Sequence, residues 1–158
     1  MGDTDIDNDK RFMNLAYQEA LKAFDEGEVP VGAVVVKNGA VTGRGYNRIE
    51  ALGDATAHAE IIAIGAASNS LQSWRLEGCS LYVTLEPCLM CLGAILHSRI
   101  DRIVYAAADP RLGAIDTFSY RMEAERAYRR FPFITSGVLS DTCGDLLSSF
   151  FQALRSKD

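Results

Sequence analysis

The stretch VPVGAVVVKNGAVTGRGYN, residues 29–47, restricts the fold more than any other part of the sequence. It consists of an apolar run, the turn Lys37-Asn38-Gly39 and a second run of extended character. Asn-Gly is the preferred dipeptide of tight β-hairpin turns. The stretch therefore predicts two antiparallel strands joined at residues 37–39, and at least part of the core must be built on a sheet.

Helical and extended patterns alternate through the rest of the chain. The expected helices are 9–26, 57–68, 87–98, 118–130 and 141–155, and the expected later strands are 81–85, 102–108 and 132–138. A polar loop is expected over residues 47–56. Strands that alternate with helices run parallel, with right-handed crossovers. We therefore predict an α/β fold with three layers, α/β/α, around a central five-stranded mixed sheet.

Length and charge limit the classes of protein to consider. The 158 residues fit one domain, 1–158, in which residues 1–8 are expected to be a disordered acidic tail. The net charge of −5 arises within residues 1–28, which hold eight acidic and three basic side chains, so the charge does not exclude a nucleic-acid partner. No apolar run reaches the roughly 18 residues of a membrane span. The polar start differs from a secretory signal, and we expect a cytoplasmic protein.

Two of the four cysteines form the motif Cys88-x-x-Cys91 directly after Pro87. Residues three apart share one face of a helix, and Pro is favoured at the first helical position, so both thiols are expected near a helix start. A helix N-terminus lowers the pKa of nearby thiols, which suits redox chemistry or metal binding. Cys79 and Cys143 are interpreted as small buried residues.

His58 is the natural third metal ligand, because the chain has only two histidines. Three protein ligands leave zinc one open position, as in catalytic sites, whereas structural zinc sites use four ligands. His97 lies off the ligand face of its helix, and Cys79 is separated from the motif by a strand. The sequence therefore predicts an open, catalytic zinc site held by His58, Cys88 and Cys91.

Glu60 follows His58 by two residues at the start of a predicted helix. Helix positions two apart face nearly opposite sides, so the two side chains converge only if the helix points its N-terminus at the site. Glu60 then reaches a water molecule on the metal and can take its proton and return it. Taken alone, Glu60 is better explained as a first-turn acid favoured by the helix dipole, and the downstream P-C-x-x-C motif reverses that preference.

The segments HAE, residues 58–60, and PCLMC, residues 87–91, match the H-x-E and P-C-x-x-C signature of zinc nucleobase deaminases. Further segments extend the match: VPVGAVVV (29–36), GYNR (45–48), TAHAEI (56–61), LYVTLEPCLMCLGAILHSRI (81–100) and DTCGDLLSSFF (141–151). On these segments the chain resembles the bacterial tRNA adenosine deaminases that make wobble inosine. That family belongs to the cytidine deaminase-like superfamily, which implies the corresponding fold.

The resemblance also implies a mechanism. One zinc ion per subunit, held by His58, Cys88 and Cys91, supplies the hydroxide that attacks C6 of a flipped-out adenine. Glu60 protonates N1 and then the departing ammonia. The residues implied to contact the substrate are Asn47, Val31, Ala57, Asp109 and Phe151. The implied partners are the anticodon stem-loop of tRNA and a second copy of the chain in a homodimer.

The stretch 111–133 departs from the family pattern and leaves alternatives open. Arg111 keeps the charge of the family's loop, but Asp116 replaces a glycine. The arginines between residues 121 and 130 form either a phosphate-contacting face or a solvated helix of mixed charge.

Three other functions remain in competition. A zinc deaminase of a free nucleobase such as guanine, or of another small purine or pterin, would use every zinc residue. A non-catalytic zinc subunit that presents RNA to a partner would have no need of Glu60. A CxxC redox protein would leave His58 unexplained.

Overall fold

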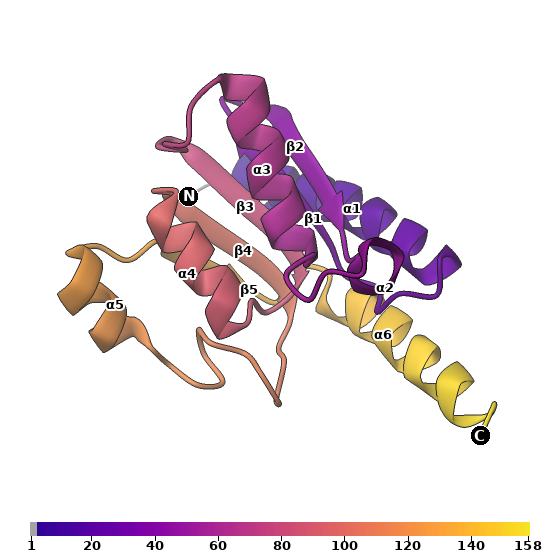
Figure 1. Ribbon diagram of the computed structural model, residues 1–158. Coiled ribbons are helices and arrows are strands. Elements are labelled where there is room, and N and C mark those ends of the chain that lie inside the picture. Colours follow the sequence, from indigo (N-terminus) through magenta and orange to yellow (C-terminus); the bar gives the residue numbers. More distant parts are fainter. Residues whose placement is uncertain (1–2) are drawn as a thin grey trace.

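Figure 1 shows the computed structural model of the protein, which describes residues 3–158. Within these residues the centre is one sheet of five strands in the order β2-β1-β3-β4-β5. The strands are β1 (Gly32–Lys37), β2 (Ala40–Tyr46), β3 (Cys79–Leu85), β4 (Arg102–Ala107) and β5 (Phe133–Ser136). β1 is antiparallel to β2 and β3, whereas β3, β4 and β5 run parallel. The predicted mixed sheet and the predicted hairpin are both confirmed.

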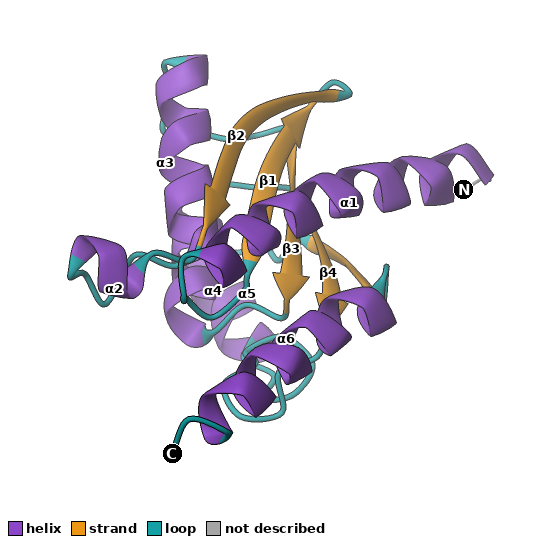
Figure 2. Ribbon diagram, turned by 90° about the vertical axis from the view of Figure 1, so that its right-hand side faces the viewer, coloured by secondary structure: helices purple, strands orange, loops and turns teal. Residues whose placement is uncertain are grey.

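Helices cover both faces of the sheet and complete the three predicted layers, as Figures 1 and 2 show together. One face carries α1 (Asp3–Asp25) and α6 (Ser140–Arg155), and the other carries α3 (Ala59–Leu71), α4 (Leu89–His97) and α5 (Arg121–Tyr128). Neighbouring residues of a strand face opposite sides of the sheet. Val35 of β1 therefore packs in the core under α3, and Val34 packs in the core under α1. This double burial explains why β1 is apolar up to Val36.

Helix α1 begins earlier than the sequence predicts. A disordered tail was expected over residues 1–8, but residues 3–8 are helical, so the prediction is wrong there; residues 1–2 lie outside the described part of the chain. Asp9 explains the difference. Its buried carboxylate accepts hydrogen bonds from Arg102 at 2.7 and 2.9 Å, which fixes this end of the helix on the sheet.

A short helix, α2 (Ile49–Leu52), lies in the segment 47–56 that was predicted to be a loop. The buried carboxylate of Glu28 accepts hydrogen bonds from the N–H groups of Glu50 at 2.9 Å and Ala51 at 3.0 Å. These N–H groups belong to a helix N-terminus and have no partner inside the helix. Glu28, more than twenty residues away in sequence, supplies the missing partner.

Helix α3 lies directly on the backbone of β2. A Cβ atom at Gly43 would lie 2.4 Å from the carbonyl oxygen of Ala63, and one at Gly45 would lie 2.5 Å from that of Ala59. Only glycine permits so close an approach. The contact places the start of α3 at the edge of the sheet where β2, β3 and β4 end.

Candidate active site

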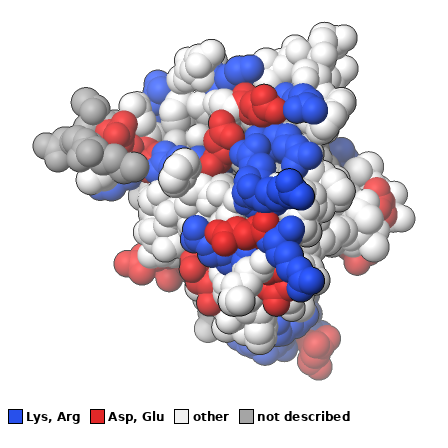
Figure 3. Space-filling model, turned by 90° about the vertical axis from the view of Figure 1, so that its left-hand side faces the viewer, with Lys and Arg blue, Asp and Glu red and all other residues white. Residues whose placement is uncertain are grey.

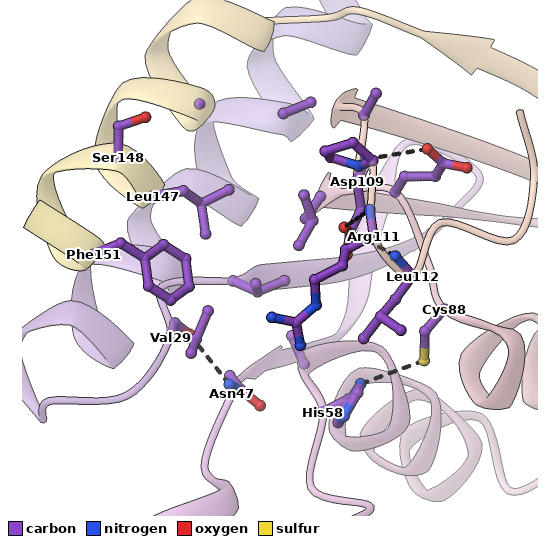
Figure 4. Close-up of a pocket in the computed structure, with 18 of the residues that line it drawn as sticks. Val29, Asn47, His58, Cys88, Asp109, Arg111, Leu112, Leu147, Ser148 and Phe151 are labelled. Atoms are coloured by element: carbon purple, nitrogen blue, oxygen red, sulfur yellow. Dashed lines mark hydrogen bonds between the residues drawn. The ribbon is translucent and has the colours of Figure 1, made fainter. Parts of the chain in front are cut away.

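A cavity of about 980 Å³ opens at the sheet edge where β2, β3 and β4 end. This is where open α/β sheets usually bind ligands. Figure 4 shows the side chains that line it. We call the lining residues from the strand ends and helix starts the pocket floor: Val31, Asn47, His58, Ala59, Glu60 and Cys88. We call those from the segment after β4 and from one face of α6 the pocket rim: Asp109, Pro110, Arg111, Leu112, Leu147, Ser148, Phe151, Gln152 and Arg155.

His58 and Cys88 of the pocket floor come together with Cys91. Nδ1 of His58 lies 3.7 Å from Sγ of Cys88 and 3.5 Å from Sγ of Cys91. The three ligand atoms lie within 4.8 Å of one another. A nitrogen and a sulfur bound to the same tetrahedral zinc ion at ordinary bond lengths lie about 3.5 Å apart. The arrangement therefore fits zinc.

Both helices that carry this cluster point their N-termini at it. His58 is the N-cap residue of α3 and Cys88 is the N-cap residue of α4, each with an extended backbone. The sequence placed Pro87 at the first position of this helix, but α4 begins at Leu89, so Pro87 stands outside it. The helix dipoles and free N–H groups favour negative charge on the sulfur atoms.

Protons are shared unequally within the cluster. The hydrogen bond from the Cys91 thiol, helped by His58, lowers the pKa of Cys88 to about 4. The hydrogen bond to Cys88, together with burial, raises the pKa of Cys91. The hydrogen bond with Cys88 also raises the pKa of His58. The cluster therefore favours the thiolate form of Cys88, and thiolate is the form in which cysteine binds a metal.

The ligand set has three members in the described part of the chain, which leaves a fourth zinc position open. His97, at the end of α4, hydrogen-bonds Tyr128 at 3.0 Å instead. Cys79 is buried at the beginning of β3, whereas the cluster lies beyond the end of that strand. Cys143, a residue of α6, is buried as well, in line with its interpretation as a core residue.

Glu60 is the second residue of α3 and is only 4% exposed, yet it lines the cavity. Burial raises the pKa of its carboxyl group. Because α3 points its N-terminus into the cavity, His58 and Glu60 both reach the pocket floor although they are two residues apart. Glu60 stands next to the ligand set without being part of it.

Four of the five residues expected to contact a substrate line the cavity: Val31, Asn47, Asp109 and Phe151. Ala57 is not part of the lining. Its side chain is buried, and its carbonyl oxygen accepts a hydrogen bond from the N–H of Arg48 at 3.0 Å. Ala57 therefore supports the turn before α3 rather than the cavity wall.

Asn47 lines the cavity and has one acceptor atom without a partner in the described part of the chain. Its Nδ2 donates a hydrogen bond to the carbonyl oxygen of Val29 at 3.3 Å, drawn in Figure 4. Its Oδ1 is buried and has no hydrogen-bond partner among the described residues. A buried acceptor without a partner in a pocket wall is free to accept a hydrogen bond from water or from a bound molecule.

Most of the pocket rim was not predicted from the sequence. Arg111 points into the cavity, and Phe151 faces it from α6 (Figure 4). The lining residues of α6 recur three and four positions apart: Gly144, Leu147, Ser148, Phe151, Gln152 and Arg155. This spacing marks one face of a helix and is readable from the sequence. Because half of these residues are polar, a search for apolar periodicity passes over them.

The arginine-rich helix α5 is shorter than the predicted 118–130 and contributes nothing to the cavity lining. Arg126 and Arg129 are exposed, whereas Arg130 forms a salt bridge with Asp101 at 2.7 Å. Figure 3 shows the face of the molecule that carries α5. Basic side chains gather in its middle, with acidic ones among them.

Comparison with known proteins identifies the family. The cytidine and deoxycytidylate deaminase zinc-binding region matches residues 6–107. The tRNA-specific adenosine deaminase of Bacillus subtilis (strain 168) is 45% identical over 149 residues, which are 94% of this chain and 92% of that protein. This chain belongs to the tRNA-specific adenosine deaminase family of zinc deaminases. It is a zinc-dependent deaminase, and the composition and spacing of the His/Cys/Cys cluster fit one zinc ion per chain.

Solved structures confirm the predicted cytidine deaminase-like fold. One, from a study of A-to-I editing by tRNA:A34 deaminases at the wobble position, has a TM-score of 0.81 and 43% identity, over 86% of this chain and 98% of that one. A guanine deaminase from Nitrosomonas europaea has a TM-score of 0.78 and 25% identity, over 89% and 83%. In the described part of this chain, no helix combines the length and apolarity of a membrane span.

Proposed function

We propose that this protein converts adenosine to inosine at the wobble position of tRNA by hydrolytic deamination. One observation carries the proposal: a single cavity brings together the His/Cys/Cys cluster, the carboxyl group of Glu60 and the unpaired acceptor of Asn47. The identity with tRNA-specific adenosine deaminases over almost the whole chain supports the choice of substrate.

A zinc ion in the cluster of His58, Cys88 and Cys91 lowers the pKa of a water molecule and makes it a nucleophile at neutral pH. The reaction also needs a group that takes a proton from this water and delivers it to N1 of adenine and to the leaving ammonia. Glu60 suits this role because it lies in the pocket floor next to the three metal-ligand residues but is not one of them.

Two further residues of the pocket floor hold the base. Oδ1 of Asn47 accepts a hydrogen bond from the target nucleoside, which satisfies an acceptor that is otherwise buried without a partner. Val31, only 8% exposed, offers an apolar surface for the ring. Together they orient the base over the metal cluster, so that the attacked carbon and Glu60 lie on the reacting side.

The size and chemistry of the cavity favour a nucleotide chain over a free base. Its volume of about 980 Å³ is near the upper end of the range for small-molecule pockets. Arg111 and Arg155 place two cations at the pocket rim, where phosphate groups would pass. Phe151, 43% exposed, presents a ring on which a neighbouring base can stack.

The proposed active form is a cytoplasmic homodimer. Leu89 and Met90, in the first turn of α4, are 55% and 38% exposed directly beside the metal cluster. Exposed apolar side chains on a helix are suited to self-complementary contact across a two-fold axis. Sedimentation equilibrium of the pure protein tests this assembly. A species with the mass of one chain at micromolar concentration would contradict it.

A deaminase of a free base is the second candidate. The similarity to the N. europaea guanine deaminase supports it, since the same fold and metal cluster would serve a small purine. Such an enzyme has no need of a cationic pocket rim. The two functions therefore differ in whether the rim contributes to turnover.

A competition among substrates tests both candidates. Purified protein is incubated with an anticodon stem-loop that carries adenosine at the wobble position and, separately, with adenine, adenosine, guanine and cytidine. Release of ammonia and formation of inosine are measured, with the Glu60→Ala protein as the blank. We expect turnover of the stem-loop. Turnover of guanine with an untouched stem-loop would establish the second candidate instead.

A further inference from the structure

Glu86, between β3 and the metal-binding segment, is 2% exposed and accepts five hydrogen bonds, all from the loop of residues 109–117. Its Oε2 accepts the successive N–H groups of residues 115–117 at 3.0–3.1 Å. Its Oε1 accepts the N–H of Asp109 at 3.2 Å and the hydroxyl of Thr117 at 2.7 Å. Glu86 borders the cavity, but both of its oxygen atoms are engaged by this loop.

The carboxylate and the loop depend on each other. No salt bridge among the described residues involves Glu86. A buried carboxylate is tolerated only if hydrogen bonds replace its water. A concave run of backbone N–H groups is a common way for a protein to bind an anion. Here the anion is a side chain of the protein itself, and binding it defines the path of the loop.

The same loop carries the part of the pocket rim that faces the substrate. Oδ1 of Asp109 accepts the N–H groups of Arg111 at 3.0 Å and Leu112 at 3.2 Å, which forms a tight turn. Arg111 and Leu112 are exposed, so packing does not hold them. The N–H of Asp109 on Glu86 is the hydrogen bond that joins this turn to the buried carboxylate.

The loop is also tied to the segment that leads into the metal cluster. The N–H of Ala114 donates to the carbonyl oxygen of Pro87 at 2.9 Å, and Gly113 pairs with Cys88 through an isolated β-bridge. A Cβ atom at Gly113 would lie 2.3–2.5 Å from the carboxyl atoms of Glu86. The absence of a side chain at Gly113 therefore allows the loop to close over the carboxylate.

We propose that Glu86 is a positioning residue for the RNA substrate, which it serves by holding the loop 109–117 so that Asp109, Arg111 and Leu112 face the cavity. The inference rests on the proposed function, because rim contacts matter for a nucleotide chain. Glu86 acts through this loop and takes no part in the chemical step. Its loss weakens substrate binding more than it slows turnover of bound substrate.

The variant Glu86→Gln separates these effects. An amide keeps the shape of the side chain, and its oxygen can still accept the three N–H groups of residues 115–117. Its NH₂ group can donate to the hydroxyl of Thr117 but cannot accept from the N–H of Asp109. The substitution therefore releases the rim end of the loop and leaves its other end bound. Glu19→Gln is the matched control, because Glu19 is also a buried carboxylate, 3% exposed, but lies on α1 away from the cavity.

Three measurements on the zinc-loaded, full-length protein test the proposal. Amide hydrogen exchange across 109–112 is expected to accelerate about tenfold in Glu86→Gln, because the N–H of Asp109 loses the acceptor that restrains the turn. The affinity for the wobble-adenosine stem-loop, measured in a Glu60→Ala background, is expected to fall about tenfold. Zinc content is expected to stay at one ion per chain. Glu19→Gln is expected to match the parent in all three.

Each alternative result overturns the proposal in a distinct way. Unchanged exchange across 109–112 would show that Glu86 does not hold the loop. Loss of zinc with an unchanged loop would make Glu86 a support of the metal-binding segment. Faster loop exchange with unchanged RNA affinity would remove its role in substrate positioning. If the parent itself fails to bind or deaminate the stem-loop, the proposed function has failed, and the exchange measurement still reports on Glu86 alone.

Discussion

The pocket floor and the pocket rim are held in place by different means. His58, Glu60 and Cys88 of the floor are buried or half-buried, at the starts of two helices that are packed on the sheet. Arg111 and Phe151 of the rim are exposed, one on a loop closed around a buried carboxylate and the other on a helix face. The groups that carry out the reaction are therefore held rigidly, whereas the side chains that recognise the substrate are exposed. Substitution of these exposed rim side chains can change the substrate contacts while the buried groups of the floor keep their places.

The largest effect is expected from removal of a metal ligand in the floor. Cys91→Ala should abolish zinc binding and reduce turnover to the background level, because two ligands do not hold zinc firmly at neutral pH. Metal analysis of the purified variant checks this directly. Cys143→Ala removes another buried thiol, outside the cluster, and should retain one zinc ion per chain. A zinc-loaded Cys91→Ala protein would contradict the assignment.

Glu60→Ala is expected to have the second largest effect on turnover, but unlike Cys91→Ala it should leave zinc binding intact. Turnover of the stem-loop is expected to fall by about 10²–10⁴-fold, the usual contribution of a general acid and base. The zinc content and the affinity for the stem-loop are expected to remain, because Glu60 is not in the ligand set. Loss of zinc in this variant would show that Glu60 binds the metal and would remove the distinction between ligand and proton carrier.

Phe151→Ala tests the rim by itself. Loss of one stacked base is expected to weaken stem-loop binding by about 1–3 kcal/mol. Any residual turnover of free adenosine is expected to be unchanged, since the floor is intact. Equilibrium binding and single-turnover rates for the two substrates separate these effects. If adenosine and stem-loop turnover fall together, Phe151 belongs functionally with the floor.

The smallest effect is expected on α5. Arg126→Glu with Arg129→Glu should change stem-loop affinity by less than about threefold, because these side chains are exposed and α5 does not line the cavity. Binding measured over a range of salt concentrations is the sharper readout. A marked loss of affinity with a shallower salt dependence would identify this helix as a phosphate-contacting surface and extend the rim to a second face.

The floor was predictable from sequence because its signals are local. His58 and Glu60 lie within three residues of each other, and Cys88 and Cys91 lie within one helical turn. Each pair sits at the start of an element that periodicity alone locates. The order of strands and helices then brings both starts to the same sheet edge.

Three features that the sequence did not reveal share one physical cause. The start of α1, the helix α2 and the path of the loop 109–117 are each fixed by a buried carboxylate from a distant part of the chain. Asp9 binds Arg102 across 93 residues, Glu28 binds Glu50 across 22, and Glu86 binds Thr117 across 31. In the sequence each of these acids looks like a surface charge. Local patterns do not reveal which carboxylates are buried, because the partner that makes burial tolerable is not nearby in sequence.

The close packing of α3 on the glycines of β2 limits which residues these positions can accept. A methyl group at Gly45 would displace the backbone of α3 at Ala59, the residue next to His58. The substitution would shift the start of α3 and thereby move His58 away from Cys88 and Cys91, although all three residues would still be present. A glycine that lies outside the active site is therefore as necessary for the activity as the histidine and cysteines of the metal cluster.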